Sequence, residues 1–402
     1  MSISVVPLRN PVLEYPWGSR TFLAGLTGGP SPSERPQAEL WMGAHPKASS
    51  MALWEGEWLP LQDVLNRDGE ELLGRVAAER FCGRLPFLFK VLAAERPLSI
   101  QAHPDRIQAR EGFRREEAQA IPLSAPHRNY RDAHHKPEIL CALTPFTAFI
   151  GFRGPEIILS LLKRLPVPML WDLFAHLRAR PRAAGLEESF GALMRARGPQ
   201  RERLIREVTE RSRSLVDSDP AFQWVLRLGQ DFPGDVGVLC PLLLNPVALK
   251  PGEAVFVRAG EPHAYMEGAG IELMANSDNV LRGGLTSKHV DIPGLLQILD
   301  FSERPVLRIG PQQRDESESV YPAPAEEFLL SVIRLDQGRQ YAGARNRSVE
   351  ILICISGKAQ VTDVEAGKAF PLEKGASVLV PAALAQYRIE GRSTIYRASV
   401  PV

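Results

Sequence analysis

Four polar residues of the chain have side chains of the types that ligate metals. Gln101 and His103, in SIQAHP, are two residues apart, so on a strand both side chains lie on one face. Glu138 follows Pro137 in HKPEILCAL, and His263 follows a turn in AGEPHAY. Two imidazoles and a carboxylate are typical of catalytic zinc sites, which leave a position open for water or substrate. A neutral amide ligand such as Gln101 would leave the metal more Lewis-acidic than an all-anionic set would.

Spacing alone leaves two interpretations of these residues open. A QxH pair on a strand is more often a surface pair or a satisfied core pair than a metal site. Of the eight histidines, only His103 and His263 lie in strand-like segments with apolar neighbours on both sides. His176 falls in a helical stretch, where a structural or exposed role is expected. The residues therefore indicate a metal site without deciding it.

The segments that carry these residues alternate in character along the chain. Residues 1–153 contain short strands and turns, with a buried strand predicted over 85–92 and a helix over 68–81. Between residues 154 and 236 apolar residues recur at helical spacing, which predicts an all-helical insertion. The strand pattern returns at residue 237, and the polar, proline-containing stretch 311–327 predicts a linker before a last group of strands.

Two segments of the chain repeat one pattern. Gly252 to His263 and Gly375 to Gln386 each contain a glycine, a short apolar strand, a turn and a polar residue at the same step. This pattern is typical of the second half of a cupin motif, and Gln386 replaces the histidine in the later copy. The expected fold is mainly β with a helical insertion: two cupin or jelly-roll barrels plus an all-α domain. The expected domains are a catalytic cupin domain (1–153 and 237–315), the insertion (154–236) and a C-terminal, metal-free cupin-like barrel (316–402).

Composition excludes several classes of partner. The 48 basic and 47 acidic residues give a net charge of +1, which argues against nucleic acid and against a membrane surface as partners. No apolar run approaches the roughly 20 residues of a membrane span, and the first residues do not have the pattern of a signal peptide. The four cysteines form no CxxC pair, which predicts free thiols and a cytoplasmic location. The balanced charge and the lack of a coiled-coil repeat are compatible with a monomer.

Five longer motifs in this chain are similar to those of one enzyme family. They are YPWGSR, AELWMGAHPKASS, LPFLFKVLAAERPLSIQAHPD, YRDAHHKPEILCALTPFTAFIGFR and AGEPHAYMEGAGIELMANSDNVLRGGLTSKHVD, starting at Tyr15, Ala38, Leu85, Tyr130 and Ala259. Through them the chain resembles the type I phosphomannose isomerase family, and the motifs follow the family's order. Pro16 departs from the family pattern, which commonly has an acidic residue there.

The resemblance implies a zinc enzyme of the cupin type with one zinc ion per chain. It implies interconversion of mannose 6-phosphate and fructose 6-phosphate, which feeds mannose metabolism or GDP-mannose synthesis. The family's zinc ligands fall on Gln101, His103, Glu138 and His263, its catalytic arginine on Arg282, and its lysine beside the zinc carboxylate on Lys136. Other pocket positions fall on Trp17, Lys90, Ser99, Tyr265, Glu272, Asp278 and Lys288.

An aldose–ketose isomerisation of this kind transfers a proton between C1 and C2 through an enediolate. It needs a base and a fixed positive charge at the developing oxyanion, and Arg282 suits the second task. The candidates for the base are Lys136, which is slightly favoured, a zinc-bound hydroxide, Asp278 and Glu272. His135 is a candidate for opening the sugar ring, and Lys90 and Ser99 are candidates for the phosphate.

Two other classes of protein fit a double cupin. One is an iron-dependent oxygenase, and the other is a sugar-binding module without activity. The amide ligand and the cations Lys136 and Arg282 favour sugar-phosphate chemistry over oxygen chemistry. The clustered cations and the full ligand set argue against a binding module.

Overall fold

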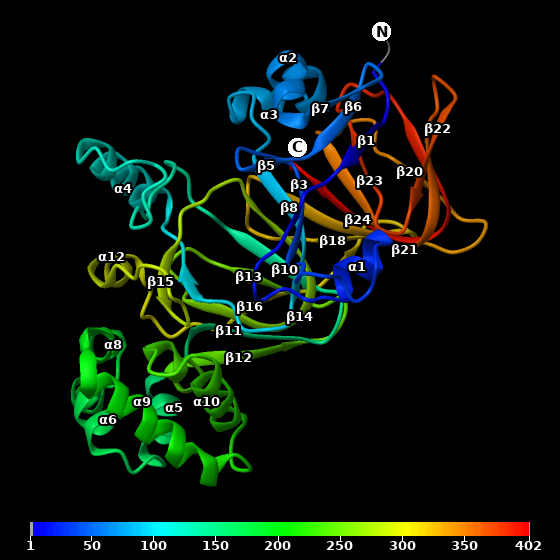
Figure 1. Cartoon of the computed structure of the whole chain (residues 1–402). Helices are drawn as coiled ribbons and strands as arrows, with labels where there is room; N and C mark the ends of the chain where they lie inside the picture. The colour runs from blue at the N-terminus through cyan, green and yellow to red at the C-terminus, as the bar shows by residue number, and fades with distance from the viewer. Residues whose placement is uncertain (1–2, 402) are drawn as a thin grey trace.

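The computed structural model describes residues 3–401, and two large antiparallel sheets dominate it (Figure 1). The first, here called the C-terminal sheet, contains β1 (Val6–Arg9), β6 (Met51–Trp54), β7 (Glu57–Pro60), β17 (Gln312–Gln313), β18 (Glu318–Tyr321), β19 (Leu329–Leu335), β20 (Gln340–Ala342), β21 (Glu350–Asp363), β22 (Lys368–Glu373), β23 (Ser377–Val380) and β24 (Tyr387–Ser399). Its order is β17-β18-β19-β24-β21-β23-β1-β6-β7, with β20 beside β24 and β22 beside β21.

The second sheet, here called the central sheet, carries the candidate metal ligands. It contains β2 (Val12–Leu13), β3 (Glu39–Met42), β8 (Phe87–Ala94), β9 (Ile100–Ala102), β10 (Glu138–Ala142), β11 (Phe146–Phe152), β12 (Leu244–Leu249), β13 (Ala254–Val257), β14 (His263–Ala275), β15 (Leu281–Gly284) and β16 (Leu307–Ile309). Its main order is β16-β13-β10-β14-β8-β3-β2, and β9, β11, β12 and β15 join it through the first half of β14. The short strands β4 (Ala44–His45) and β5 (Ala48–Ser49) pair with each other.

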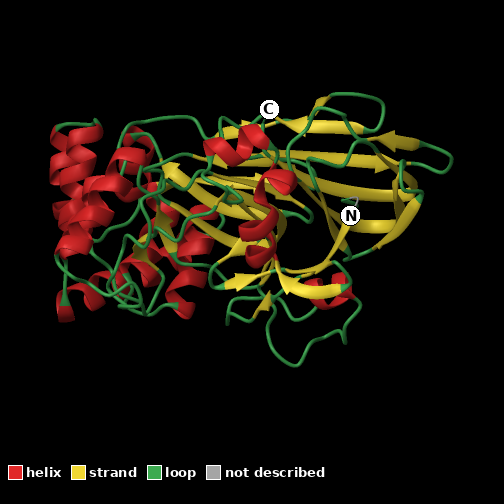
Figure 2. Cartoon of the chain, turned by 90° about the horizontal axis from the view of Figure 1, so that it is seen from above, coloured by secondary structure: helices red, strands yellow, loops and turns green. Residues whose placement is uncertain are grey.

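Most helices of the described chain lie between β11 and β12. This helical segment contains α5 (Pro155–Lys163), α6 (Pro168–Leu173), α7 (Ala175–Ala179), α8 (Ala183–Arg195), α9 (Gly198–Ser212), η1 (Arg213–Leu215), α10 (Pro220–Asp231), η2 (Val236–Leu239) and α11 (Cys240–Leu243). Figure 2 shows these helices gathered at one end of the molecule and the strands extending away from them. The other helices are α1 (Phe22–Thr27), α2 (Leu61–Leu73), α3 (Arg75–Arg80), α4 (Arg106–Ala118) and α12 (Ile292–Ile298).

Several elements confirm the predictions from the sequence. The strand expected over 85–92 is β8, and all eight of its residues are buried because it lies between β14 and β3. The helix expected over 68–81 is divided between α2 and α3. The repeated pattern also gives matching strands: β13 and β23 each begin two residues after their glycine.

The chain differs from the predictions in two places. The expected linker over 311–327 is wrong, because this stretch forms β17 and β18, and β18 pairs with β19 with Val320 opposite Ser331. The first strand of the chain also lies in the sheet of the last strands, with Val6 of β1 opposite Leu379 of β23. The expected division into domains at 153, 236 and 315 stays a prediction.

The largest apolar core lies between the two sheets. It contains Phe87, Ile139 and Ile271 from the central sheet together with Leu330 and Ile351 from the C-terminal sheet. The cysteines are free: Cys82 is exposed, and Cys141, Cys240 and Cys354 are buried. Within residues 3–401, no helix has both the length and the apolar character needed to cross a membrane.

Candidate active site and metal centre

Three strands of the central sheet bring the candidate metal ligands together. Glu138 is the first residue of β10, directly after Pro137, and His263 is the first residue of β14. Gln101 lies in β9 opposite His263, and His103 follows the end of that strand. The prediction that these segments are strands is therefore confirmed. Because neighbouring strands are about 5 Å apart, this register places the four side chains in one region.

Both histidine rings are held by backbone carbonyl groups. Nδ1 of His103 donates a hydrogen bond to the carbonyl oxygen of Asn279 (2.7 Å), and Nδ1 of His263 donates to that of Glu261 (3.1 Å). Because a carbonyl oxygen only accepts, each Nδ1 carries the ring proton, and each Nε2 presents a lone pair. Such hydrogen bonds are typical of metal-ligating histidines, since they fix the tautomer and the direction of the ring.

The two lone pairs face a buried carboxylate. Nε2 of His103 lies 3.3 Å from Oε1 of Glu138, and Nε2 of His263 lies 3.5 Å from Oε2. All three side chains are buried, and Nε2 of His103 has no hydrogen-bond partner. Three acceptor atoms within 4.8 Å of one another, without a proton between them, fit a divalent cation. The donor set of two imidazoles and a carboxylate therefore fits zinc.

Charges around this set keep the ligands in the forms that bind metals. Burial and the neighbouring Lys136 ammonium lower the pKa of His103 to about 4. Burial alone would raise the pKa of Glu138, but Lys136 and His103 hold it well below its usual range. Nζ of Lys136 lies 3.1 Å from Oε1 of Glu138. A neutral imidazole and an ionised carboxylate are the forms that coordinate a cation.

A cavity of about 540 Å³ opens onto the metal set. Most predicted site residues line it: Trp17, Lys90, Ser99, Gln101, Lys136, Glu138, His263, Tyr265, Glu272, Arg282 and Lys288. His103 belongs to the metal set but is not among the lining residues.

One wall of the cavity carries a buried lysine between two carboxylates. Nζ of Lys90 lies 2.9 Å from Oε2 of Glu272 and 3.4 Å from Oε1 of Glu39. Burial opposes the charge of Lys90, but Glu272 and Glu39 raise its pKa far above the usual range. Burial also raises the pKa of Glu272 and that of Tyr265, whose hydroxyl group is buried in the cavity wall without a hydrogen-bond partner. This wall offers donors and acceptors for the hydroxyl groups of a sugar.

Cations gather at another part of the cavity wall. Burial and then the neighbouring Arg131 lower the pKa of Arg282. Burial and then Arg282, Lys47 and Arg131 lower the pKa of Lys288. The charged groups that act on these two side chains are thus all cations. An anionic group of a ligand would relieve their mutual repulsion.

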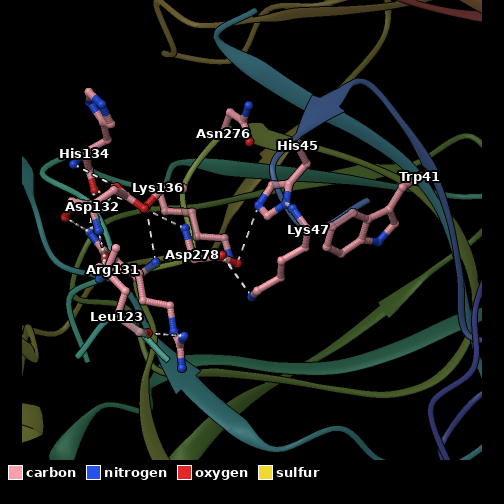
Figure 3. Close-up of polar contacts among 12 residues, drawn as sticks. Trp41, His45, Lys47, Leu123, Arg131, Asp132, His134, Lys136, Asn276 and Asp278 are labelled. Carbon is pink, nitrogen blue, oxygen red and sulfur yellow. Dashed lines mark hydrogen bonds and ion pairs between the residues drawn. The ribbon is translucent and has the colours of Figure 1, made fainter. Parts of the chain in front are cut away.

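Besides His103, two predicted site residues lie outside the cavity lining. Figure 3 shows Asp278 directed toward His45 and Lys47, with distances of 3.6 Å to Nε2 and 2.9 Å to Nζ. Burial would raise the pKa of Asp278, but His45 and Lys47 hold it well below its usual range. Nε2 of His135 lies 2.7 Å from Oε1 of Glu327, which belongs to the segment before β19. The structure therefore does not place Asp278 and His135 in the lining of this cavity, and their roles toward a substrate stay predictions.

Sequence reasoning missed several residues of the site. Glu39 lies in the motif AELWMGAHPKASS, so a search for acidic partners of Lys90 could have found it. Asn279 acts on His103 through its backbone carbonyl, which no side-chain motif records. Asp231 and Phe232 line the cavity from the end of α10, and their position could not be deduced from a helical pattern alone.

Family models match both ends of the chain. Residues 5–155 match the model described as phosphomannose isomerase type I, catalytic domain. Residues 317–400 match the model described as mannose-6-phosphate isomerase, cupin domain.

Full-length relatives and solved structures agree with these models. The chain is 41% identical to mannose-6-phosphate isomerase of Escherichia coli strain K12 over 394 residues, which cover 97% of this chain and 98% of that protein. It is 32% identical to the human protein of that name over 405 residues, covering 94% and 93% of the two chains. A crystal structure of zinc-bound mannose 6-phosphate isomerase superimposes with a TM-score of 0.91 at 38% identity, covering 100% of both chains. With this similarity along its length, the chain belongs to the type I phosphomannose isomerase family.

Proposed function

We propose that this chain is a zinc-dependent aldose–ketose isomerase that interconverts mannose 6-phosphate and fructose 6-phosphate. The observation that carries the proposal is one cavity that joins the metal set, a wall of sugar-compatible polar groups and a cluster of cations. The relatives named mannose-6-phosphate isomerase support the substrate, and their zinc-bound structure supports the metal. The reaction would serve mannose metabolism or GDP-mannose synthesis.

Gln101, His103, Glu138 and His263 would hold one zinc ion. When bound, zinc acts as a Lewis acid that polarises the carbonyl and hydroxyl oxygens of the open-chain sugar. Gln101 is supported as the fourth ligand by its place opposite His263 and in the cavity wall. In the C-terminal repeat Gln386 stands at the position of His263, so one zinc ion per chain is expected.

The proton transfer between C1 and C2 needs a base within reach of the substrate. Lys136 and Glu272 both line the cavity, whereas Asp278 is held by His45 and Lys47 outside it. Lys136 stays the proposed base, and Glu272 is the alternative, because its raised pKa suits a group that gains and loses a proton. If Lys136→Ala kept normal deuterium exchange at C2 and Glu272→Gln lost it, Glu272 would be the base.

The phosphate and the developing oxyanion both need positive charge. Arg282 lies opposite Gln101 in the strand register, which supports a role beside the metal and at the oxyanion. Lys288 and Ser99 are the proposed phosphate contacts. Lys90 is a weaker candidate for the phosphate than the sequence indicated, because two carboxylates already surround its ammonium group. It suits a sugar hydroxyl better.

One experiment separates the three classes of function that fit the sequence. Purified protein is analysed for metal and assayed in a coupled mannose 6-phosphate assay, before and after treatment with a chelator. Zinc, with activity that the chelator abolishes and added zinc restores, is the expected result. Iron without isomerase activity would favour the oxygenase, and absence of both metal and activity would favour the sugar-binding module.

Three further expectations belong with this proposal. The finer architecture, two cupin barrels plus an all-α domain, is supported by the repeated strand–turn–strand pattern and by the helices between β11 and β12. A cytoplasmic location and a monomeric state stay predictions.

A further inference from the structure

The segment that follows β15 has an unusual backbone. Gly284 has a φ of 132°, and Leu285, which is buried, has a φ of 55°. Non-glycine residues rarely adopt positive φ values, and such strain persists only where the surroundings enforce it. Leu285, Thr286, Ser287 and Lys288 all line the cavity. These four residues are called the 285–288 loop below, and their backbone conformation sets where Lys288 lies.

A carboxylate of the helical segment holds this loop. Oδ1 of Asp235 accepts hydrogen bonds from the backbone N–H of Leu285 (2.9 Å) and of Gly237 (2.7 Å). Oδ2 of Asp235 accepts one from the N–H of Thr286 (3.2 Å). Hydrogen bonds to a charged acceptor are stronger than neutral ones, so Asp235 fixes two consecutive N–H groups of the strained loop. Asp235 itself does not line the cavity.

The backbones of the two segments also touch. A Cβ atom at Gly237 would lie 2.7 Å from the nitrogen of Leu285, and one at Gly284 would lie 2.8 Å from Oδ1 of Asp235 and from Cα of Gly237. Both distances are shorter than real Cβ contacts, so each position admits only glycine. The contact between η2 and the 285–288 loop is therefore a close-packed junction of backbone with backbone.

The same part of the helical segment reaches the cavity directly. Asp231 and Phe232, at the end of α10, line it, and Asp235 follows three residues later. The chain from the end of α10 to η2 thus lines the cavity with Asp231 and Phe232, and it contacts the 285–288 loop through Asp235.

We propose that Asp235 is a positioning residue through which the helical segment holds the 285–288 loop in the conformation that binds the anionic group of the substrate. The inference rests on the proposed function, in which this group is the phosphate of mannose 6-phosphate. It gives the helical segment a role in catalysis beyond folding. The chemistry of the ligand is that of a phosphate monoester dianion, recognised by Lys288 and by the ordered backbone of the loop.

The test compares Asp235→Ala and Asp235→Asn with a matched control, Asp219→Ala. Asp219 belongs to the same helical segment and caps α10 by accepting from the N–H of Ala221 (2.8 Å). The control removes a similar carboxylate–backbone hydrogen bond at the start of α10, far along the helix from the 285–288 loop. Asp235 lies after the end of α10 and bonds to that loop. Asp235→Asn keeps the size of the side chain and one carbonyl oxygen, so it provides the test if Asp235→Ala does not fold.

Three quantities are measured on the zinc-loaded full chain: kcat and KM for mannose 6-phosphate, the dissociation constant of inorganic phosphate, and the zinc content. We expect Asp235→Ala to raise KM and the phosphate dissociation constant about tenfold, because displacement of a binding group by about an ångström weakens its contacts strongly. Asp235→Asn is expected to have a smaller effect in the same direction. The zinc content stays at the wild-type value, kcat changes less than KM, and Asp219→Ala leaves both KM and the phosphate dissociation constant unchanged.

Hydrogen exchange of the peptide that covers the 285–288 loop gives an independent readout. Its amides should exchange faster in Asp235→Asn than in Asp219→Ala. Unchanged KM, phosphate affinity and exchange in Asp235→Asn would overturn the inference, and so would an equal change in Asp219→Ala. If the wild-type protein did not turn over mannose 6-phosphate, the proposed function would fail. The phosphate affinities of wild type and Asp235→Asn would still decide whether Asp235 orders an anion site.

Discussion

The side chain of Asn279 organises the loops beside the metal set. It is fully buried, and its Oδ1 accepts from the backbone N–H of Arg131 (2.7 Å). Its Nδ2 donates to the carbonyl oxygens of Asp132 and His134 (2.8 Å each). The side chain thereby fixes the position of its own backbone carbonyl, which holds the ring of His103. One residue thus connects the segment before Lys136 with a candidate metal ligand.

Asn279→Ala should weaken zinc binding. Loss of the side-chain hydrogen bonds frees the carbonyl that orients His103, and loss of such outer contacts typically lowers metal affinity by about 10- to 100-fold. The zinc dissociation constant is measured by competition with a chromophoric chelator. The matched control is Asn10→Ala, since Asn10 also uses both ends of its amide, with Ser377 and Ser50, but in the C-terminal sheet region. Equal zinc affinities of the two variants would exclude this role for Asn279.

The contacts of Asp278 with His45 and Lys47 predict a pH dependence of stability. His45 and Lys47 hold the pKa of Asp278 below its value in the unfolded chain. A depressed pKa contributes stability that is present above the unfolded pKa, about 4, and is lost as the pH falls below it. Asp278→Asn should therefore lower the free energy of unfolding by about 1–2 kcal/mol at pH 7, with a smaller difference below pH 4. Urea denaturation at several pH values measures this, with the exposed Asp217→Asn as control. If the difference in the free energy of unfolding between wild type and Asp278→Asn stayed constant with pH, the lowered pKa of Asp278 would be contradicted.

At the scale of single residues, the sequence predicted the ligand types better than their surroundings. Gln101, His103, Glu138 and His263 were identified by type and family motif, and three of them form the observed acceptor set. The partners of Lys90 and Asp278 were not predicted, because they lie far away in the sequence. Those of Lys90 come from β3 and β14, and those of Asp278 from β4 and the turn after it. Long-range pairs of this kind leave no local pattern.

The strand β14 connects the metal set with the opposite wall of the cavity, and Gly268 lies where it changes partners. Before this residue β14 pairs with β11, and after it β14 pairs with β10 and β8. Gly268 has a φ of 118°, and a Cβ atom there would lie 2.6 Å from the carbonyl oxygen of Pro145. Gly268 lies between His263 and Glu272 on this strand, so its backbone conformation affects how these two side chains are placed relative to each other.

Gly268→Ala should therefore lower the free energy of unfolding and also displace the cavity residues that lie on β14. Backbone strain and a close contact with a carbonyl oxygen predict a loss of roughly 2–4 kcal/mol in the free energy of unfolding. The control is Gly310→Ala, where a Cβ atom would meet open space. The free energies of unfolding of both variants are measured by denaturant titration. A Gly268→Ala variant as stable as the control would show that this position tolerates a side chain.

At the scale of elements, strands and helices with strong periodicity were predictable and their partners were not. β8, β10 and the start of β14 followed from apolar runs, Pro137 and a turn. The stretch 311–327 was mistaken for a linker because β17 and β18 are short and lie at the edge of their sheet, where polar residues are tolerated. Nothing near β1 indicated that it would pair with β23, since its partner lies more than 300 residues away.

In the whole molecule, the two sheets share one core. Residues of both sheets form the largest apolar cluster, and β1, β6 and β7 tie the beginning of the chain into the C-terminal sheet. Polar contacts cross the same boundary, such as the contact of His135 with Glu327 and the ion pair of Arg106 with Glu326. Separation of the sheets would expose this core to water, so they are expected to unfold as one cooperative unit.

The cysteines provide reporters for this prediction without any mutation. Cys141 lies in β10 of the central sheet and Cys354 in β21 of the C-terminal sheet, and both are buried. Samples at increasing urea concentration are briefly treated with iodoacetamide, and each alkylated cysteine is quantified by mass spectrometry. Exposed Cys82 should react without urea and serves as the control. Cys141 belongs to the core that the two sheets share, and Cys354 to a second apolar cluster of the C-terminal sheet. If the sheets unfold as one unit, both cysteines should become reactive with the same midpoint. Reaction of Cys354 in a separate transition at lower urea would mean that the C-terminal sheet unfolds independently.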